Sequence, residues 1–286
     1  MDLKKKSALF HINRKNVLLI LGLTLSALII LITIFSPLLE THNPTKMNLP
    51  NKLKAPSSEN FFGTDALGRD VYSRILEGSR VSLGTAFVVV IFSAILGTAI
   101  GLFSGFIGGS TDMICMRIVD IFLAFPTIVF VLAMTTFLPT TQLSLILAIC
   151  CINWVRYARI ARGEAVIIRN VEYIEAATAI GNSKAGILFR YFLPNTISKI
   201  LIMMSTDIGS IILYCASLSF LGLGTQPPSP AWGTMINEGR DYIRNAPWIS
   251  IAPGIAVAVT ALSFNMIGDG LRDALDPRMR ESIQTE

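Results

Sequence analysis

Four polar side chains recur every three or four residues along one apolar segment: Asp207, Ser210, Tyr214 and Ser217. That spacing puts them on one face of an α-helix. Asp207 lies eight residues beyond Lys199, which is about 12 Å into such a helix. Because lipid cannot satisfy a polar face, the pattern predicts that these side chains line a translocation path or pack against another helix. Asn265 and Asp269, on a later apolar segment, are candidates for the same role.

A polar segment with a fixed pattern of small residues lies between two apolar segments. It contains Glu175-Ala176-Ala177, then Gly181 after three residues, then Tyr191-Phe192-Leu193-Pro194 after nine more. Small side chains allow a close approach by a partner, and a carboxylate can meet a basic group there. The pattern therefore predicts protein–protein contact, with Ala176, Ala177 and Ile180 forming a small, apolar, protruding surface.

The same segment predicts two helices joined by a turn. Acidic residues fall in the first turns of the first helix, where the helix dipole favours negative charge. The expected caps and stops are Asn170 at the first start, Gly181 at the first end, Asn182 or Ser183 at the second start, and Pro194 just after the second end at Phe192.

The residue patterns of catalysis and cofactor binding are absent from the sequence. It has no glycine-rich phosphate loop, and its two histidines, His11 and His42, are far apart, so neither serves a nucleophile as general base. The four cysteines lie in or beside apolar segments without a C-x-x-C pattern, as expected of small packing residues. We therefore expect no enzyme activity, metal site or cofactor. We also expect no nucleic-acid partner, because no basic face carries groove-reading or aromatic residues.

The composition indicates a membrane protein. The 286 residues are 52% hydrophobic and 15% charged, whereas soluble domains are nearer a quarter charged. Apolar runs of about 18 residues or more can cross a bilayer. The six predicted spans are Val17–Leu39, Leu83–Phe103, Ile118–Phe137, Leu143–Val155, Ser198–Leu221 and Ile249–Ile267. The fourth is the shortest because Asn153 and Arg156 interrupt it, and an alternative extends it into Tyr157–Ile160. The first is longer than the core of a signal peptide and no cleavage pattern follows it, so we expect it to be retained.

Basic residues predict the orientation of these spans. With the N-terminus inside, Lys and Arg on the inner side outnumber those outside two to one, which follows the positive-inside rule. We expect a multi-pass protein of the cytoplasmic membrane, in contact with lipid, with both termini in the cytoplasm. The expected divisions are a basic tail over 1–16, a first transmembrane helix over 17–39, an extracytoplasmic segment with a short amphipathic helix over 40–82, a five-helix core over 83–272 with a cytoplasmic loop at about 156–196, and a tail over 273–286.

Small residues and one proline shape the predicted spans. The residues Ser93, Gly97, Gly101 and Gly105 are four apart, which predicts a helix face that another helix approaches closely, although membrane helices also simply tolerate glycine. Pro126 lies inside the third span and predicts a kink there. Asp120 is expected to pair with Arg117.

Four segments resemble the dipeptide, oligopeptide and nickel branch of the ABC-importer permeases, in particular its shorter, second permease subunit. They are the Glu175–Pro194 pattern; Gly63-Thr64-Asp65 with Gly68-Arg69-Asp70 and Ser73-Arg74; Leu218-Ser219-Phe220-Leu221-Gly222-Leu223-Gly224 with Pro227-Pro228 and Trp232-Gly233; and Gly268-Asp269-Gly270-Leu271-Arg272-Asp273 with Asp276-Pro277-Arg278. The resemblance implies an all-α integral membrane fold with six transmembrane helices, the type I importer permease fold, and a cytoplasmic "EAA" coupling loop.

The resemblance also implies partners and a cargo. The chain is expected to pair with a second homologous permease subunit as a heterodimer, with two cytoplasmic ATPase subunits and with an extracytoplasmic solute-binding protein. The helix over Glu175–Gly181 is expected to dock in a groove of one ATPase, so that ATP drives alternating access. The expected cargo is a di- or oligopeptide, with nickel or another metal–chelate complex as the alternative. Tyr191 departs from the usual aliphatic residue, and Cys215 replaces a Glu of many relatives, which weakens a preference for cationic peptides.

Two other classes of function compete with this interpretation. A stand-alone channel or secondary transporter predicts inverted repeats and ionisable residues at mid-membrane, where Asp207 is the one good candidate. An intramembrane enzyme needs a nucleophile beside a base, and the sequence offers no such pair.

Overall fold

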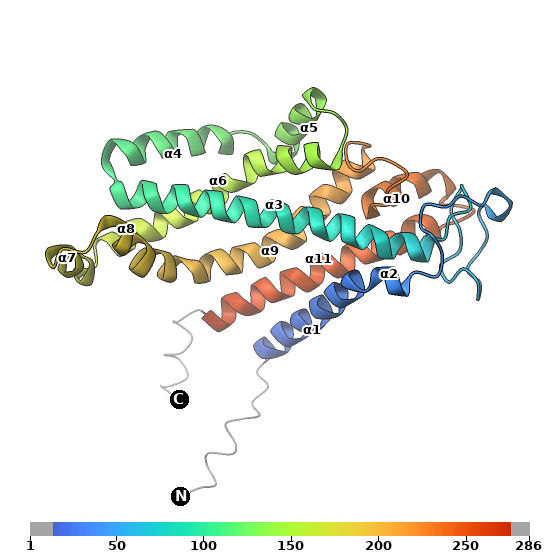
Figure 1. Cartoon of the computed structure of the whole chain (residues 1–286), viewed down its shortest axis with the longest axis horizontal. Coiled ribbons are helices and arrows are strands. Elements are labelled where there is room, and N and C mark those ends of the chain that lie inside the picture. The colour runs from blue at the N-terminus through green and yellow to red at the C-terminus, as the bar shows by residue number, and fades with distance from the viewer. Residues whose placement is uncertain (1–13, 276–286) are drawn as a thin grey trace, which may run out of the picture.

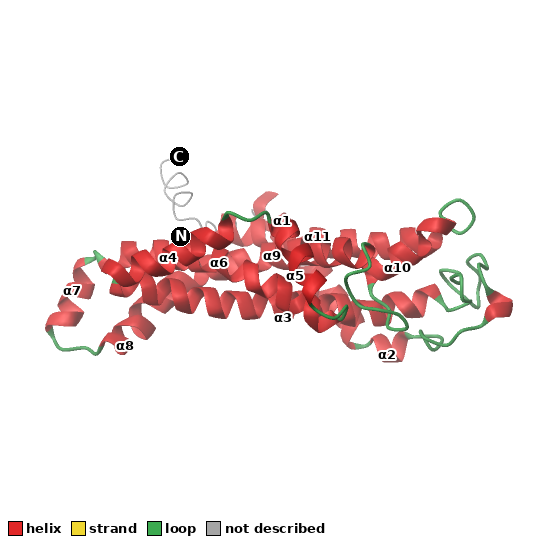
Figure 2. Cartoon of the chain, turned by 90° about the horizontal axis from the view of Figure 1, so that it is seen from above, coloured by secondary structure: helices red, strands yellow, loops and turns green. Residues whose placement is uncertain are grey.

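The structure is a computed structural model, and it describes residues 14–275. The described chain is made of helices joined by loops (Figure 2). The α-helices are α1 Arg14–Ile34, α2 Ser36–Leu39, α3 Val71–Ile107, α4 Gly109–Leu123, α5 Thr127–Phe137, α6 Gln142–Arg169, α7 Glu172–Ala179, α8 Lys184–Ile187, α9 Leu193–Phe220, α10 Trp232–Gly239 and α11 Trp248–Leu275. Short 3₁₀ turns lie at Leu49–Asn51 and Arg240–Tyr242, and a π-helical turn at Leu188–Phe192 joins α8 to α9.

Five stretches of helix are long and apolar enough to cross a membrane, namely those of α1, α3, α6, α8–α9 and α11. The consecutive helices α4 and α5 form a sixth span if they are counted together, and they meet at 86°. Pro126 stands at the start of α5, where its ring prevents α4 from continuing. The predicted kink at Pro126 is therefore confirmed. The number of spans agrees with the predicted six when the bent pair is counted as the third span.

The spans form one elongated bundle (Figure 1). Helix α3 packs along α6, α9 packs against α3 and α11, and α1 lies along α11. Helices α7 and α8 lie at one end of the bundle. The loop over 40–70 and helix α10 lie at the opposite end. The two polar ends are thus separated by the length of the apolar helices.

A buried ion cluster holds the loop end together. Arg69 Nε lies 2.6 Å from Asp65 Oδ2, and both Arg69 and Arg74 reach Glu238 Oε2 of α10 at 2.8 Å. Asp70 caps α3 by accepting a hydrogen bond from the backbone N–H of Ser73. The charged residues of the Gly63–Arg74 motif therefore have a structural role, because they hold the loop against α3 and α10.

Three predicted helix boundaries were wrong. The amphipathic helix predicted within 40–82 is not separate, because α3 runs without a break from Val71 to Ile107. The first transmembrane helix, predicted over 17–39, ends at Ile34, and the short helix α2 follows it. The fourth span does not end at Val155 but continues as α6 to Arg169, because polar residues that favour a loop in sequence also suit the exposed face of a helix.

The cytoplasmic loop predicted at about 156–196 is consequently shorter. Only residues 170–183 lie between the long helices, and α7 is within them. Asn170 does not cap α7, whose first flanking residue is Val171; the Asn170 side chain instead donates to the Val166 carbonyl oxygen. Pro194 does not end a helix but lies in the first turn of α9, where a missing N–H costs little. The predicted tails over 1–16 and 273–286 lie largely outside the described residues.

Candidate functional site

Helix α7 ends in a tight left-handed turn. Gly181 has a φ of +85°, which glycine adopts without steric cost. Its N–H donates to the Thr178 carbonyl oxygen at 3.0 Å, and the N–H of Asn182 donates to the Ala177 carbonyl oxygen at 3.2 Å. These two bonds form a Schellman motif, which ends α7 and turns the chain sharply towards Ser183. The Ser183 hydroxyl then caps α8 by accepting from the Gly186 N–H.

The two faces of α7 have different surroundings. Ile174 and Ala177 are buried, and Ile174 packs in an apolar cluster with Phe192. On the other face Glu175 and Ala176 are exposed, and Ile180 at the tip is 80% exposed. The buried edge anchors the helix on the bundle, while the outer face offers a carboxylate, a small residue and an aliphatic tip to a partner. We name this outer face, with Glu175, Ala176 and Ile180, the α7 surface.

The last two residues of the sequence pattern lie away from that surface. Leu193 is partly buried against the apolar cluster that contains Ile174, and Pro194 is exposed at the start of α9. Both residues lie where the protruding segment joins α9, so they contribute to its attachment to the bundle. Among the residues of the pattern, Glu175, Ala176 and Ile180 are those that a docking protein can touch most readily.

The polar side chains predicted to share one face of α9, Asp207, Ser210, Tyr214 and Ser217, are only partly accessible to a molecule that crosses the bundle. Asp207 is 1% exposed and forms an ion pair with Arg156 of α6, whose Nη1 lies 2.8 Å from Asp207 Oδ1. Ser210 and Ser217 donate to carbonyl oxygens of their own helix, those of Thr206 and Leu213, as hydroxyls in helices often do. Asp207 therefore cannot touch a passing molecule in this arrangement, and the two serines need no partner.

Asn265 lies in the contact between α9 and α11. A side chain added at Gly209 would meet the Asn265 amide, with 2.9 Å between Cβ and Oδ1. Asp269, one turn further along α11, is exposed. Asn265 is thus placed beside a glycine of α9, and it is partly accessible there.

Tyr214 and Arg156 meet at a cavity of about 80 Å³ beside the bend between α4 and α5. Phe122 and Phe125 line the same cavity. Arg156 was not among the predicted path residues, because its charge placed it at the border between the fourth span and the predicted cytoplasmic loop. Its spacing of three residues from Asn153, which donates to Asp207 at 3.3 Å, would have placed both on one face of a longer helix.

The small residues of α3 lie against α6. A side chain added at Gly97 would collide with the Trp154 carbonyl oxygen and come within 2.6 Å of Tyr157 Cβ, and one at Gly105 would lie 2.6 Å from Ala165 Cβ. The fully buried Ser93 is on the same stripe. Close packing of this kind holds helices together in lipid.

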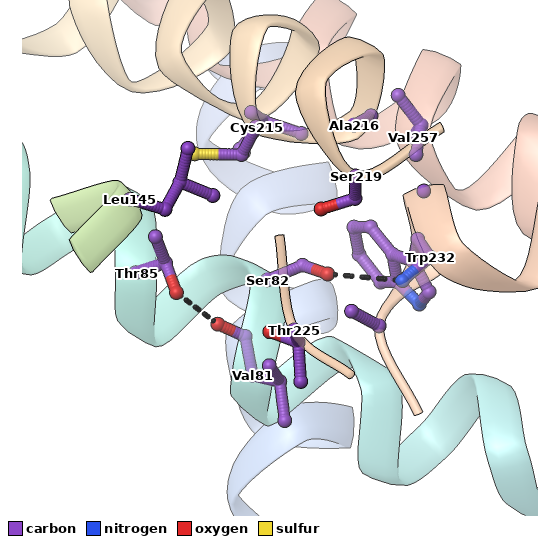
Figure 3. A pocket seen from close by; sticks show the side chains of 13 residues that line it. Val81, Ser82, Thr85, Leu145, Cys215, Ala216, Ser219, Thr225, Trp232 and Val257 are labelled. Atoms are coloured by element: carbon purple, nitrogen blue, oxygen red, sulfur yellow. Dashed lines mark hydrogen bonds between the residues drawn. The ribbon is translucent and has the colours of Figure 1, made fainter. Parts of the chain in front are cut away.

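Asp120 has a different partner from the one predicted, and Cys215 lies far from α7. Asp120 pairs with Arg159 of α6 at 2.7 Å and not with Arg117, because α4 lies beside α6. Cys215 is buried and lines a narrow cavity at the other end of the bundle (Figure 3). There the backbone N–H of Trp232 donates to Ser82 Oγ at 3.2 Å, and the Thr85 hydroxyl donates to the Val81 carbonyl oxygen. Cys215 thus faces helix-packing residues.

Comparison with known proteins adds a family to this geometry. Residues 97–281 match the family described as the binding-protein-dependent transport system inner membrane component. The chain is 42% identical over 267 residues to a dipeptide transport system permease protein of Alkalihalophilus pseudofirmus, covering 93% of this chain and 88% of the relative. It is 41% identical over 251 residues to a probable D,D-dipeptide transport system permease protein of Escherichia coli, covering 88% and 84%. It is also 38% identical over 268 residues to an oligopeptide transport system permease protein of Bacillus subtilis, covering 94% and 88%.

Proposed function

Because this chain belongs to the inner membrane components of binding-protein-dependent transport systems, we propose that it forms half of a pathway for peptides that separate ATPase subunits drive through the α7 surface. The chain is a multi-pass membrane permease subunit. The proposal adds the cargo, the docking residues, the heterodimer with a second homologous permease and the orientation with α7 in the cytoplasm.

The cargo is inferred from relatives. The three relatives are named for dipeptide, D,D-dipeptide and oligopeptide transport, and their similarity to this chain extends over most of each chain. These functions favour a peptide over nickel or a metal–chelate complex. A solute-binding protein outside the membrane delivers the peptide, and the permease itself makes no covalent change.

The docking surface is inferred from the geometry of α7. An exposed aliphatic tip at Ile180 beside the carboxylate of Glu175 suits a groove with an apolar floor and a basic rim. The buried Ile174 belongs to an apolar cluster that also contains Leu102 of α3 and Ile168 of α6. A push on α7 is therefore transmitted to the spans as a movement of packed helices, which have discrete rather than continuous arrangements.

The observation that carries this proposal is the exposed, sharply terminated α7 on a chain so similar to peptide permeases. Glu175→Arg should abolish peptide uptake and uncouple ATP hydrolysis, because a like-charge contact with a basic groove costs several kcal/mol. The matched control is Glu59→Arg, the same charge change at an exposed position in the opposite loop. Uptake and peptide-stimulated ATPase activity should be measured in membranes with equal amounts of the assembled transporter.

Normal uptake by Glu175→Arg would contradict docking at this surface. Vigorous solute movement by this chain in vesicles without a nucleotide-hydrolysing partner would favour the rival class, a channel or secondary transporter.

A further inference from the structure

One guanidinium group lies deep in the bundle and is nearly half exposed. Arg156 is 14 residues from the start of α6 at Gln142, about 21 Å along the helix. Asp207 is 13 residues from the end of α9 at Phe220, about 20 Å from that end. The Arg156 side chain is 48% exposed, whereas that of Asp207 is 1% exposed. A charged group at this depth is costly in lipid, so the exposed side of Arg156 has to face water or protein.

Other basic residues of α6 have a simpler explanation. Arg159 and Arg162 lie one and two turns closer to the α7 end and pair with Asp120 and Asp112 of α4. Long basic side chains near a helix end can reach the membrane surface. Arg156 cannot extend in the same way, because its ion pair with buried Asp207 holds it at depth.

The ion pair with Asp207 uses only one of the three guanidinium nitrogens of Arg156. Arg156 Nη1 donates to Asp207 Oδ1 at 2.8 Å, and the described residues accept no hydrogen bond from Arg156 Nε or Nη2. Asn153 occupies the second oxygen of Asp207 at 3.3 Å, which fixes the carboxylate. The remaining guanidinium donors form a planar fork that matches a second carboxylate.

The fork adjoins a cavity whose walls are partly aromatic and aliphatic and partly uncharged polar. The cavity of about 80 Å³ lies where α4 and α5 bend apart, and Phe122, Phe125 and Tyr214 line it together with Arg156. Among the described residues that line it, Arg156 alone is charged. A cavity with a single cation among uncharged apolar and polar side chains suits a carboxylate attached to a mostly uncharged chain, which is the chemistry of a peptide C-terminus.

We propose that Arg156 binds the C-terminal carboxylate of a peptide in transit and that Asp207 positions Arg156 for this contact. The proposal rests on the proposed import of peptides and names the contact within the pathway. Pairing with Asp207 offsets the charge of Arg156, so that the carboxylate is attracted and can still leave, as conduction requires. Asp207 acts through Arg156 and does not touch the peptide.

The test uses the assembled transporter in lipid vesicles with trialanine and trialanine amide, which differ in the C-terminal charge. Arg156→Gln should lower trialanine uptake roughly tenfold or more, as expected for loss of a charged hydrogen bond, and should affect the amide much less. Arg156→Lys should retain part of the trialanine uptake. Arg159→Gln, three residues away on α6, is the matched control and should leave the ratio of the two uptake rates unchanged.

A double variant separates this role from simple charge balance. Arg156→Gln with Asp207→Asn removes both charges and leaves no unpaired buried carboxylate. We expect it to import trialanine amide well and trialanine poorly. If it imports trialanine as the wild type does, Arg156 serves only to neutralise Asp207 and the proposal is wrong.

Accessibility provides a readout that does not depend on the cargo. Arg156→Cys with Asp207→Asn, in a chain whose accessible Cys115 and Cys151 are replaced by Ala, should react with a charged thiol reagent that does not cross membranes, and trialanine should slow the reaction. Absence of reaction with uptake intact would overturn the Arg156 assignment and leave peptide import standing. If the wild-type transporter carries neither trialanine nor its amide, peptide import is wrong and the carboxylate contact fails with it.

Discussion

Gly181 sets the direction in which the chain leaves α7. Its φ of +85° belongs to a region that side chains with a Cβ rarely adopt. Among the described residues, apart from its two chain neighbours, no atom lies within 4 Å of the position where a Cβ would stand. A substitution there therefore changes backbone strain and little else, which makes Gly181 a clean probe of the shape of the α7 surface.

We expect Gly181→Val to impair coupling more than Gly181→Asn. A β-branched residue in the left-handed region costs at least about 1–2 kcal/mol, whereas asparagine tolerates this conformation better. The valine variant should relax the Schellman turn and shift Ile180, so that peptide-stimulated ATPase activity and uptake fall severalfold at equal protein levels. The asparagine variant should retain most of both. Equal activity of the two variants would show that coupling does not depend on this turn.

The close contact between α3 and α6 depends on glycines, which have no side chain to separate the two helices. Gly101 faces α6 so closely that an added Cβ would collide with the Ala158 carbonyl oxygen and lie 2.9 Å from Ala161 Cβ. Gly84 is on the same helix, and within residues 14–275 no atom outside its own turn of helix lies within 4 Å of its added Cβ. The two glycines thus form a matched pair in which only one position carries a helix contact.

Gly101→Ala should destabilise the protein by about 1–3 kcal/mol, because an overpacked contact forces the helices apart. Gly84→Ala should be neutral or slightly stabilising, since alanine favours a helix over glycine. The measurement is the midpoint of thermal unfolding of the purified protein in detergent, followed for both variants beside the wild type. A Gly101→Ala midpoint at or above that of Gly84→Ala would contradict close packing at Gly101.

Hydropathy and helix-breaking residues predicted the helices. They could not predict which residues of distant helices pair with each other. Six apolar runs gave the spans, Pro126 gave the bend and Gly181 gave the end of α7, because each acts through its own stretch of chain. The extension of α6 beyond Ile160 to Arg169 was missed, because an arginine on a helix face and one in a loop look alike without the neighbouring helix. Asp207 and Arg156 are 51 residues apart, and only the packing of α6 on α9 brings them together.

The ion cluster at the loop end shows the same limit. The motif residues Asp65, Arg69 and Arg74 were visible in the sequence, but their partner Glu238 is 169 residues beyond Arg69. In α7 the sequence predicted a protruding surface of Ala176, Ala177 and Ile180, but Ala177 is buried against the bundle and only the other two are exposed. In the stripe of α9 the sequence selected Asp207 and not the accessible Arg156. Local patterns find protruding segments well, and they do not identify which of two paired charges is exposed.

The bundle has two polar ends, and the proposed mechanism gives each end a different function. Helix α7 marks one end, and the loop over 40–70 with α10 marks the other (Figure 1). A coupling surface is useful only on the side where ATP is available, while a binding protein has to approach from the opposite side. The orientation of the molecule in the membrane therefore decides whether the proposed mechanism is physically possible.

Lys184, at the start of α8, and Lys46, in the loop over 40–70, are both exposed and report on the two ends. In a chain with Cys115 and Cys151 replaced, we expect Lys46→Cys to react with an impermeant thiol reagent added to intact spheroplasts. Lys184→Cys should react only after the membrane is opened, because the positive-inside rule places the basic α7 end in the cytoplasm. The opposite pattern would put α7 outside, beyond the reach of any ATP-driven partner, and docking at the α7 surface would then be excluded whatever the cargo.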